Sequence, residues 1–262
     1  MSLIRETIEK ANSESRLALS IYLTSGYPDK DNFVNLALSV LEAGADMLEI
    51  GIPFSDPLAD GPIIQKSSFE ALQNGVTLEI TLDYCRQIRR STSKPIILMG
   101  YLNPILIYGL ERFFDHAVEA GVNGLIIPDL PLEEHTRLFK DSSRSLDITL
   151  LTTPTSNIDR IKRIDSASSG FVYCVSVTGT TGIREGFSND ILANLQKTHD
   201  NVIKNKMMIG FGISNVEDII KLKPYCNGVI VGSAVIKSLM QEQNSIDPVK
   251  TLQLINKLKT AC

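Results

Sequence analysis

The sequence lacks the features that mark membrane and secreted proteins. None of its apolar runs approaches the roughly 20 residues that a membrane-spanning helix needs. The first residues, Met1 to Glu6, carry charge early and contain no apolar signal core. We therefore expect a cytoplasmic protein that makes no use of a membrane.

Cysteine and histidine are scarce, and neither is spaced as a metal site. The four cysteines show no CxxC spacing and no nearby histidine, and the three histidines stand apart in polar, helix-like stretches. This pattern is typical of buried or incidental thiols in a reducing compartment, with histidines at the surface. We predict neither a disulfide framework nor a bound metal. The residues concerned are Cys85, Cys174, Cys226, Cys262, His116, His135 and His199.

Positive charge is also in short supply. The net charge is −4, the isoelectric point is near 5.5, and the sequence contains no basic run. These values argue against a nucleic-acid partner. Any anion that the protein binds must therefore be held by local geometry and not by bulk charge.

Short apolar runs rich in β-branched residues alternate with segments of helical period. The runs are nearly continuous in apolar character, as expected for strands that are covered on both faces. Alternating strands and helices predict a parallel sheet, and eight strands favour a closed (β/α)8 barrel, or TIM barrel, over an open sheet. The predicted strands are Leu17–Leu23, Met47–Gly51, Pro95–Gly100, Gly124–Ile127, Thr149–Leu151, Gly170–Val175, Met207–Gly210 and Gly228–Gly232.

The connections between the predicted strands agree with this barrel. Gly44 and Gly121 follow helical segments directly and predict left-handed helix ends that turn into the next strand. The longest gap, after the second strand, predicts extra helix around Ile63–Asn74 and Leu78–Arg90. The segment Leu3–Asn12 is expected to cap the bottom of the barrel. No linker or low-complexity tract divides the chain, so we expect one domain over its whole length.

The second predicted strand carries a carboxylate. Alternation places Leu48 and Ile50 toward the helices, and Met47 and Glu49 inside the barrel. Barrel enzymes hold their catalytic groups at the carboxyl ends of strands, and desolvation there raises the pKa of a carboxyl group toward neutrality. The alternative is a structural Glu49 paired with a cation, but the predicted strands contain no lysine or arginine.

The loop after this strand holds two aspartates among three prolines. Prolines restrict the backbone of a loop that must present side chains to a ligand. Asp56 and Asp60 each allow two interpretations, as a cap of the following helix or as a catalytic group. We predict capping for Asp56 and catalysis for Asp60.

Three further segments follow strands at the same end of the barrel. Gly210, Gly212 and Gly232, with Ser233, predict a phosphate site, for which ordinary tight turns are the alternative. The glycine-rich segment 176–186 suits a mobile lid or, alternatively, a plain surface loop. Asn103-Pro104 predicts a turn that exposes Tyr101 near the barrel mouth.

Five blocks of sequence, taken together, resemble the tryptophan synthase alpha chain family. The first, Leu48 to Pro62, is highly specific, whereas the glycine turns alone would not be. The blocks occur in the family's order and so span nearly the whole chain. They are Leu48–Pro62, Gly100–Pro104, Pro128–Pro131, Thr178–Gly182 and Gly210–Ile213.

The resemblance implies a retro-aldol cleavage of indole-3-glycerol phosphate to indole and glyceraldehyde 3-phosphate. It implies that Glu49 protonates indole C3 and accepts the proton of the glycerol hydroxyl next to the scissile bond. It implies that Asp60 holds the indole N–H and stabilises the positive charge on the ring. Such chemistry needs two carboxyl groups in different protonation states.

The resemblance also assigns substrate-binding positions. Tyr22 stands where many members have phenylalanine, and Val177 and Thr180 depart from the family's lid pattern. The implied indole pocket consists of Tyr22, Ile64, Met99, Ile126 and Phe211, with Tyr101 at the mouth. Tyr173 and Thr181 are the implied supports of the two carboxylates. The implied phosphate ligands are Gly182, Gly212, Gly232 and Ser233.

The family implies a partner as well. An alpha chain docks on a pyridoxal-phosphate-dependent beta chain, in a complex of two alpha and two beta chains, and the cofactor belongs to the beta chain. The resemblance places the docking surface around Pro53–Pro57, Asn103–Leu106 and Pro128–Glu133. Two alternatives remain at this point, a barrel isomerase acting on a phosphorylated sugar and a non-catalytic subunit that activates a beta chain.

Overall fold

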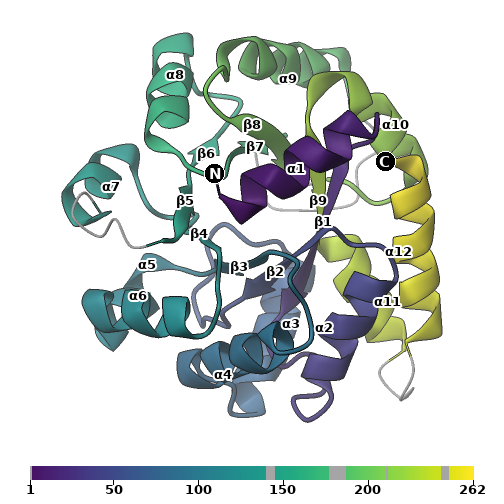
Figure 1. Ribbon diagram of the computed structural model, residues 1–262. Helices are drawn as coiled ribbons and strands as arrows, with labels where there is room; N and C mark the ends of the chain where they lie inside the picture. Colours follow the sequence, from purple (N-terminus) through teal and green to yellow (C-terminus); the bar gives the residue numbers. More distant parts are fainter. Residues whose placement is uncertain (1, 140–144, 177–186, 211, 243–247) are drawn as a thin grey trace.

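The computed structural model of the protein describes residues 2–139, 145–176, 187–210, 212–242 and 248–262. Within these residues, parallel strands form one sheet in the order β5-β4-β3-β2-β1-β9-β8-β7-β6, surrounded by helices (Figure 1). The strands are β1 (Ala18–Thr24), β2 (Met47–Gly51), β3 (Ile96–Met99), β4 (Gly124–Ile126), β5 (Asp147–Thr149), β6 (Leu151–Thr152), β7 (Phe171–Val175), β8 (Lys206–Gly210) and β9 (Gly228–Val231).

The two ends of this sheet meet, so the predicted barrel is confirmed. β5 pairs with β4 and β6 pairs with β7, and Leu150 alone separates β5 from β6. The predicted fifth strand is therefore interrupted at Leu150. There the backbone N–H bonds the Ser168 hydroxyl (3.3 Å) in place of a strand, while the carbonyl accepts from the N–H of Tyr173 (3.0 Å). The backbone hydrogen bonding of this segment thus changes at Leu150 from β4 to β7.

The helices cover the outside of the barrel, and α1 lies across its amino-terminal end (Figure 1). Ile4, Ile8 and Ala11 are the fully buried face of α1, which confirms the predicted cap. The helices are α1 (Leu3–Ser13), α2 (Phe33–Glu42), α3 (Pro62–Gln73), α4 (Leu78–Arg89), α5 (Leu102–Tyr108), α6 (Leu110–Glu119), α7 (Leu132–Phe139), α8 (Ile158–Ala167), α9 (Asn189–Asn201), α10 (Val216–Leu222), the 3-10 helix η1 (Lys223–Tyr225), α11 (Ser233–Gln241) and α12 (Val249–Ala261).

The predicted helix ends and the extra helices are confirmed. Gly44 and Gly121 have φ angles of 119° and 76°, the left-handed region in which a side chain would be strained. α3 and α4 fill the long gap after β2. None of the helices in the described ranges is both long and apolar enough to cross a bilayer.

The predicted turn at Asn103-Pro104 is wrong. α5 begins at Leu102, so Pro104 lies in the first turn of a helix, where a missing N–H costs no hydrogen bond. Tyr101 is the residue before this helix and is buried, not exposed.

Candidate active site

Glu49 lies inside the barrel on β2, as alternation predicted, and none of its surface is exposed. Its Oε1 accepts a hydrogen bond from the Ser20 hydroxyl of β1 (3.0 Å), and its Oε2 has no hydrogen-bond partner among the described residues. Burial raises the pKa of Glu49 from 4.5 to about 8, and the Ser20 bond lowers it only in part. Glu49 is therefore protonated at neutral pH and able to give up that proton.

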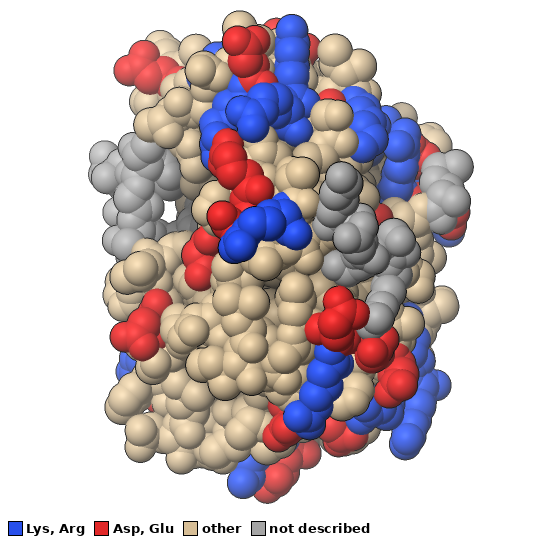
Figure 2. All heavy atoms as spheres, turned by 90° about the vertical axis from the view of Figure 1, so that its left-hand side faces the viewer, with Lys and Arg blue, Asp and Glu red and all other residues tan. Residues whose placement is uncertain are grey.

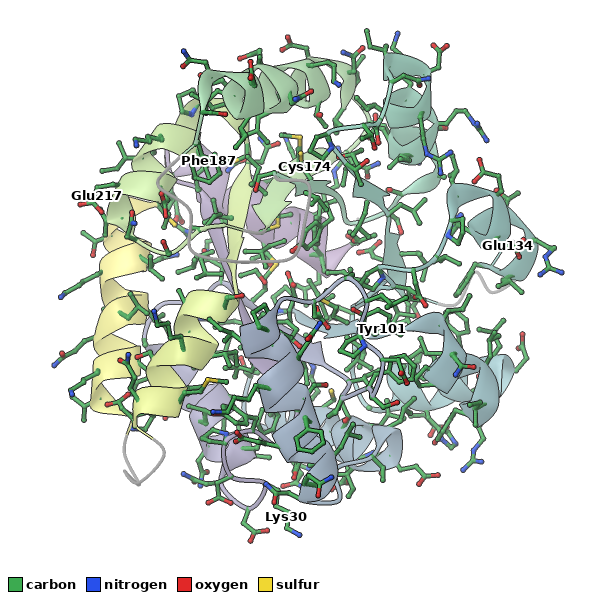
Figure 3. The ribbon with its side chains drawn as sticks, turned by 180° about the vertical axis from the view of Figure 1, so that it is seen from behind. Lys30, Tyr101, Glu134, Cys174, Phe187 and Glu217 are labelled. Carbon is green, nitrogen blue, oxygen red and sulfur yellow. The ribbon has the colours of Figure 1, made fainter. Side chains whose placement is uncertain are left out.

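Asp60 closes the segment that joins β2 to α3, and it is 8% exposed. Burial raises the pKa of its carboxyl group to about 6, and a hydrogen bond from Tyr101 opposes this shift. The Tyr101 hydroxyl also accepts from the N–H of Ala59 (3.0 Å). Figure 3 shows Tyr101 on the face of the barrel opposite α1. Near neutral pH, Asp60 is mainly ionised while Glu49 keeps its proton.

The predicted capping role of Asp56 is wrong. The N-cap of α3 is Gly61, which makes no side-chain hydrogen bond, and Pro62 occupies the first helical position. Proline is favoured at this position because its missing N–H costs no hydrogen bond within the helix and its fixed φ suits a helix start. Asp56 is exposed and accepts a hydrogen bond from the Ser55 hydroxyl instead.

Two tyrosines lie beside the carboxyl groups, each against a glycine of the neighbouring strand. A Cβ atom on Gly51 would overlap the hydroxyl of Tyr22, and a Cβ on Gly210 would overlap that of Tyr173. Burial raises the pKa of both phenols well above 10, and the charges of Glu49 and Asp60 raise both further. The four groups therefore lie within electrostatic reach of one another. Each glycine ends a strand, but sequence reasoning gave Gly51 no role and assigned Gly210 to the phosphate site, so it missed both contacts with tyrosine.

Apolar side chains lie beside these groups at the carboxyl ends of the strands. Met99 of β3 is the register partner of both Gly51 and Ile126, so these positions adjoin across three strands. Ile64 comes from the first turn of α3. All three side chains are buried. The structure therefore places Tyr22, Met99, Tyr101, Ile126 and Tyr173 around the two carboxyl groups at this end of the barrel, and Ile64 is buried at the start of the helix that follows Asp60. Thr181, Gly182 and Phe211 lie outside the described residues, as do Val177 and Thr180.

The turns after the last two strands differ in whether side chains cap the helix that follows. Gly212 adopts a φ of 79° after β8. The α10 helix that follows is capped by its own side chains, because Asn215 accepts from the Asp218 N–H (2.9 Å) and Asp218 accepts from the Ser214 N–H (2.9 Å). By contrast, Gly232 caps α11 without a side-chain hydrogen bond, and Ser233 begins that helix. The amino end of α11 is therefore better suited to an anion.

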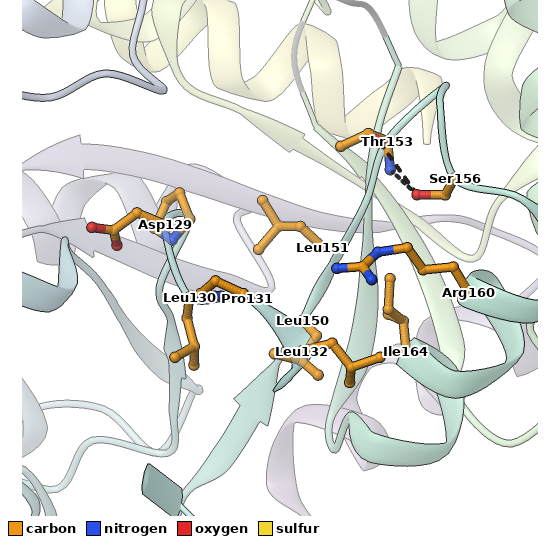
Figure 4. Close-up of a pocket in the computed structure, with 11 residues that line it drawn as sticks. Asp129, Leu130, Pro131, Leu132, Leu150, Leu151, Thr153, Ser156, Arg160 and Ile164 are labelled. Carbon is orange, nitrogen blue, oxygen red and sulfur yellow. Dashed lines mark hydrogen bonds between the residues drawn. The ribbon is translucent and has the colours of Figure 1, made fainter. Parts of the chain in front are cut away.

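A separate cavity of about 310 Å³ lies outside the barrel, where the loops before α7 and α8 face each other (Figure 4). Leu150 and Leu151 supply part of its apolar wall, and the Thr153 N–H donates to the Ser156 hydroxyl (3.1 Å) at its edge. Arg160 also lines it and pairs with Glu133 (3.1 Å). In Figure 2, charged side chains gather in the upper half of this face, and the area below them at the centre and left carries few charges, whereas the lower right and the bottom edge carry charges again.

Comparison with known proteins decides the family. The family model described as tryptophan synthase alpha chain matches residues 8–262. The chain belongs to the tryptophan synthase alpha chain family. The tryptophan synthase alpha chain of Flavobacterium psychrophilum is 42% identical to it over 236 residues, which are 89% of this chain and 93% of that one. The one from Geotalea daltonii is 40% identical over 260 residues, 99% and 98% of the two chains.

Solved structures agree with this assignment. The tryptophan synthase alpha chain of Legionella pneumophila superposes with a TM-score of 0.88 at 34% identity, covering 100% of this chain and 97% of that one. A chain of tryptophan synthase from M. tuberculosis in an aminoacrylate-bound form gives 0.87 at 29% identity, covering 100% and 99%. The resemblance and the fold expected from the sequence are thereby confirmed.

The tryptophan synthase alpha chain family cleaves indole-3-glycerol phosphate to indole and glyceraldehyde 3-phosphate, a lyase reaction of tryptophan biosynthesis. The pyridoxal phosphate of tryptophan synthase belongs to the beta chain. Family membership decides against the sugar-phosphate isomerase that the sequence left open.

Proposed function

We propose that this chain cleaves indole-3-glycerol phosphate by acid–base catalysis, with Glu49 moving the protons and Asp60 binding the indole N–H. The observation that carries this proposal is the pair of buried carboxyl groups at one barrel mouth with different pKa values, about 8 and about 6. At pH 7 one is an acid and the other an anion, which are the two states that the reaction needs.

The reaction begins with proton transfer from Glu49 to C3 of the indole ring. Positive charge then develops on the ring nitrogen, and the Asp60 carboxylate stabilises it through the N–H. Glu49, now ionised, accepts the proton of the glycerol hydroxyl next to the scissile bond. That hydroxyl becomes the aldehyde of glyceraldehyde 3-phosphate, and the electron pair of the broken bond returns to the ring. Glu49 gives one proton and takes one back, so it ends in its starting state. We therefore propose that the cleavage of indole-3-glycerol phosphate needs no cofactor.

The other site residues receive roles from their positions. Tyr22, Ile64, Met99 and Ile126, with Phe211, line the indole pocket in this proposal, and Tyr101 holds Asp60. Tyr173 and Thr181 support the carboxylates around the substrate. The phosphate lies at the amino end of α11, where Gly232 and Ser233 offer N–H groups and a hydroxyl, together with Gly212 and Gly182. The uncapped start of α11 supports this placement.

The variants Glu49→Gln and Asp60→Asn test the catalytic assignment. Each keeps the side-chain size and removes one ionisable group, so indole release should fall at least about 10²-fold while the circular dichroism spectrum stays unchanged. Near-normal release by the Glu49 variant would sink the proposal. Adding a beta chain tests the remaining alternative, because a non-catalytic subunit shows no cleavage even in the complex.

We further propose that the chain docks on a tryptophan synthase beta chain, two copies of each per complex. The expected surface, Pro53–Pro57, Asn103–Leu106 and Pro128–Glu133, adjoins exposed apolar side chains: Leu58 is 87% exposed and Ile107 78%. The cavity beside Pro128–Leu132 offers the partner a recess on the same side. We infer a cytoplasmic location, which the four unpaired cysteine thiols support.

A further inference from the structure

The segment that carries Asp60 has no strand neighbour to hold it. After Ile52, whose N–H still donates to Met99 (2.8 Å), residues 53–61 form no strand or helix. A backbone outside regular structure must find its hydrogen bonds in turns and side chains. Asp60 can therefore keep a fixed place opposite Glu49 only if other elements bond this segment.

Ser68 of α3 bonds the start of the segment. Its hydroxyl accepts from the N–H of Phe54 (3.0 Å) and donates to the carbonyl of the same residue (3.4 Å). One side chain thus satisfies both backbone groups of Phe54, as a neighbouring strand would. Ser68 is 4% exposed, so water is a poor substitute at this position.

Phe54 in turn connects Ser68 with Asp60. Its ring packs on the ring of Tyr101, with the centroids 5.3 Å apart. The Tyr101 hydroxyl accepts from the N–H of Ala59 (3.0 Å), the residue before Asp60, and its interaction with the Asp60 carboxyl group lowers the pKa of that group. A shift of Phe54 would therefore move the ring that holds Asp60.

The helix that carries Ser68 is itself fixed to the barrel. The neighbouring Ser67 is fully buried, and its hydroxyl lies 2.6 Å from that of Thr24, the last residue of β1. Because Ser67 donates to the carbonyl of Ile64 (2.9 Å), it accepts from Thr24. β1 also pairs with β2, the strand of Glu49. The helix that carries Ser68 and the strand that carries Glu49 are therefore both held by β1.

We propose that Ser68 is a positioning residue for the reaction: acting through Phe54 and Tyr101, it fixes the carboxyl group of Asp60 relative to Glu49. Ser68 touches no reacting atom in this scheme. The inference rests on the proposed function, because it assigns Asp60 a part in catalysis. A merely structural serine would lower the stability of the fold without changing how the folded enzyme titrates.

The test compares Ser68→Ala with Ser68→Thr, which keeps the hydroxyl, in the full chain with a beta chain present. Lys66→Ala, an exposed change on the same helix, is the matched control. Ser68→Ala should lower kcat about tenfold, on the order of one lost hydrogen bond, and change KM less than about threefold. The acidic limb of the pH–rate profile should move to higher pH, because the Tyr101 bond lowers the pKa of Asp60. Ser68→Thr should return kcat to within about threefold of the wild type.

Tyr101→Phe removes the last contact in the series from Ser68 through Phe54 and Tyr101 to Asp60. It should move the acidic limb in the same direction, and Ser68→Ala should then add little to it, since both act on one carboxyl group. Additive effects, an unchanged limb, or equal losses in Ser68→Ala and Ser68→Thr would overturn the proposal. If Ser68→Ala does not fold, Ser68→Cys takes its place, because a thiol of similar size bonds only weakly.

A failure of the proposed function is distinguishable from a failure of this inference. If the wild type cleaves no indole-3-glycerol phosphate with or without a beta chain, the proposed function fails. The carbon NMR titration of Asp60 then decides the positioning role by itself. A higher pKa in Ser68→Ala, but not in Ser68→Thr or Lys66→Ala, supports it, and an unchanged pKa contradicts it.

Discussion

At the scale of single residues, the two carboxyl groups differ because their surroundings differ. Glu49 is enclosed by the barrel and has one hydroxyl partner, whereas Asp60 lies at the mouth and is held by Tyr101. The protonated form of Glu49 and the ionised form of Asp60 coexist between their pKa values of about 8 and about 6. If both forms are required, kcat/KM is bell-shaped, with limbs near these two pH values.

Indole release from indole-3-glycerol phosphate, measured from pH 5 to pH 9, checks this shape. The residual activity of Asp60→Asn should show no acidic limb in its pH profile, because the group that titrates there is gone. Lys66→Ala, on the exposed face of α3, serves as the control that keeps both limbs. A flat profile in the wild type between pH 5 and pH 9 contradicts the assignment of the two groups.

The same burial makes Glu49 a source of instability at high pH. Its pKa is 4.5 when unfolded and about 8 when folded, so the folded state holds the proton more tightly. The stabilising contribution is complete below pH 4.5 and is lost as the pH rises through 8. Glu49→Gln cannot ionise. Its free energy of unfolding, relative to the wild type, should therefore increase by about 2 kcal/mol or more between pH 5 and pH 9, at roughly 1.4 kcal/mol per pKa unit.

Urea unfolding at the two pH values measures this difference. Wild type and variant must be compared at each pH, since other groups titrate equally in both. A constant difference between pH 5 and pH 9 would show that Glu49 ionises normally in the fold.

Some residue-level features followed from the sequence and others did not. Strand alternation was enough to place Glu49 inside the barrel. Successive side chains of a strand point to opposite faces, so Glu49 must face away from the side on which Leu48 and Ile50 meet the helices. Its partner Ser20 could not be predicted, since the contact depends on the register between two strands. The capping of α3 was misjudged because Asp56 has the right residue type, whereas Gly61 and Pro62 set the actual start of the helix.

At the scale of elements, the ends of neighbouring strands are fitted to each other. The hydroxyl of Tyr22 on β1 occupies the space that a side chain on Gly51 of β2 would need. Gly51→Ala should therefore push the ring away and destabilise the fold by about 1–3 kcal/mol, the usual cost of overpacking a core. Tyr22→Leu in the same chain removes the colliding hydroxyl and should recover part of that loss.

Thermal unfolding of the two single variants and the double variant measures the coupling between these positions. Gly75→Ala is an informative comparison, because a Cβ there meets open space and only its positive φ is unfavourable. Strictly additive effects of Gly51→Ala and Tyr22→Leu contradict the proposed collision.

The elements themselves were largely predictable, with two instructive exceptions. Periodicity and the glycines at positions 44 and 121 located helices and their ends, because a left-handed cap has few alternatives. The break at Leu150 was not predictable, since it arises where the ladder passes from β4 to β7. α5 was missed because Asn-Pro is typical of turns, although proline is equally at home in the first turn of a helix.

At the scale of the whole molecule, the amino-terminal end of the barrel serves stability and the opposite end serves function. Asp46 pairs with Arg16 before β1 and with Lys259 of α12 (2.8 Å each), and the Leu17 N–H donates to the carbonyl of Cys262 (2.9 Å). These bonds join the beginning and the end of the barrel. Because the closure is made at this end, the loops at the other end are free to form the site and to meet a partner.

The proposed docking surface makes a prediction at this scale. Ile107 on α5 is 78% exposed and directly follows the expected docking segment Asn103–Leu106. By contrast, Ile203 after α9 is 80% exposed next to Lys204, whose carbonyl accepts a hydrogen bond from Arg5 of α1 at the other end of the barrel. The two side chains are matched in type and exposure. Ile107→Glu should weaken binding to the beta chain at least about tenfold, because it places a charge in an apolar contact, and Ile203→Glu should leave it unchanged.

Titration of a beta chain with each variant, followed by sedimentation velocity and by indole release, measures this effect. If the chain docks through the mouth of the barrel, Ile107→Glu should also keep the wild-type activity of the isolated chain, since the Ile107 side chain is 78% exposed on α5. Equal weakening by both variants would indicate a general effect of added charge. Weakening by Ile203→Glu alone would place the interface at the amino-terminal end and leave the mouth of the barrel open in the complex.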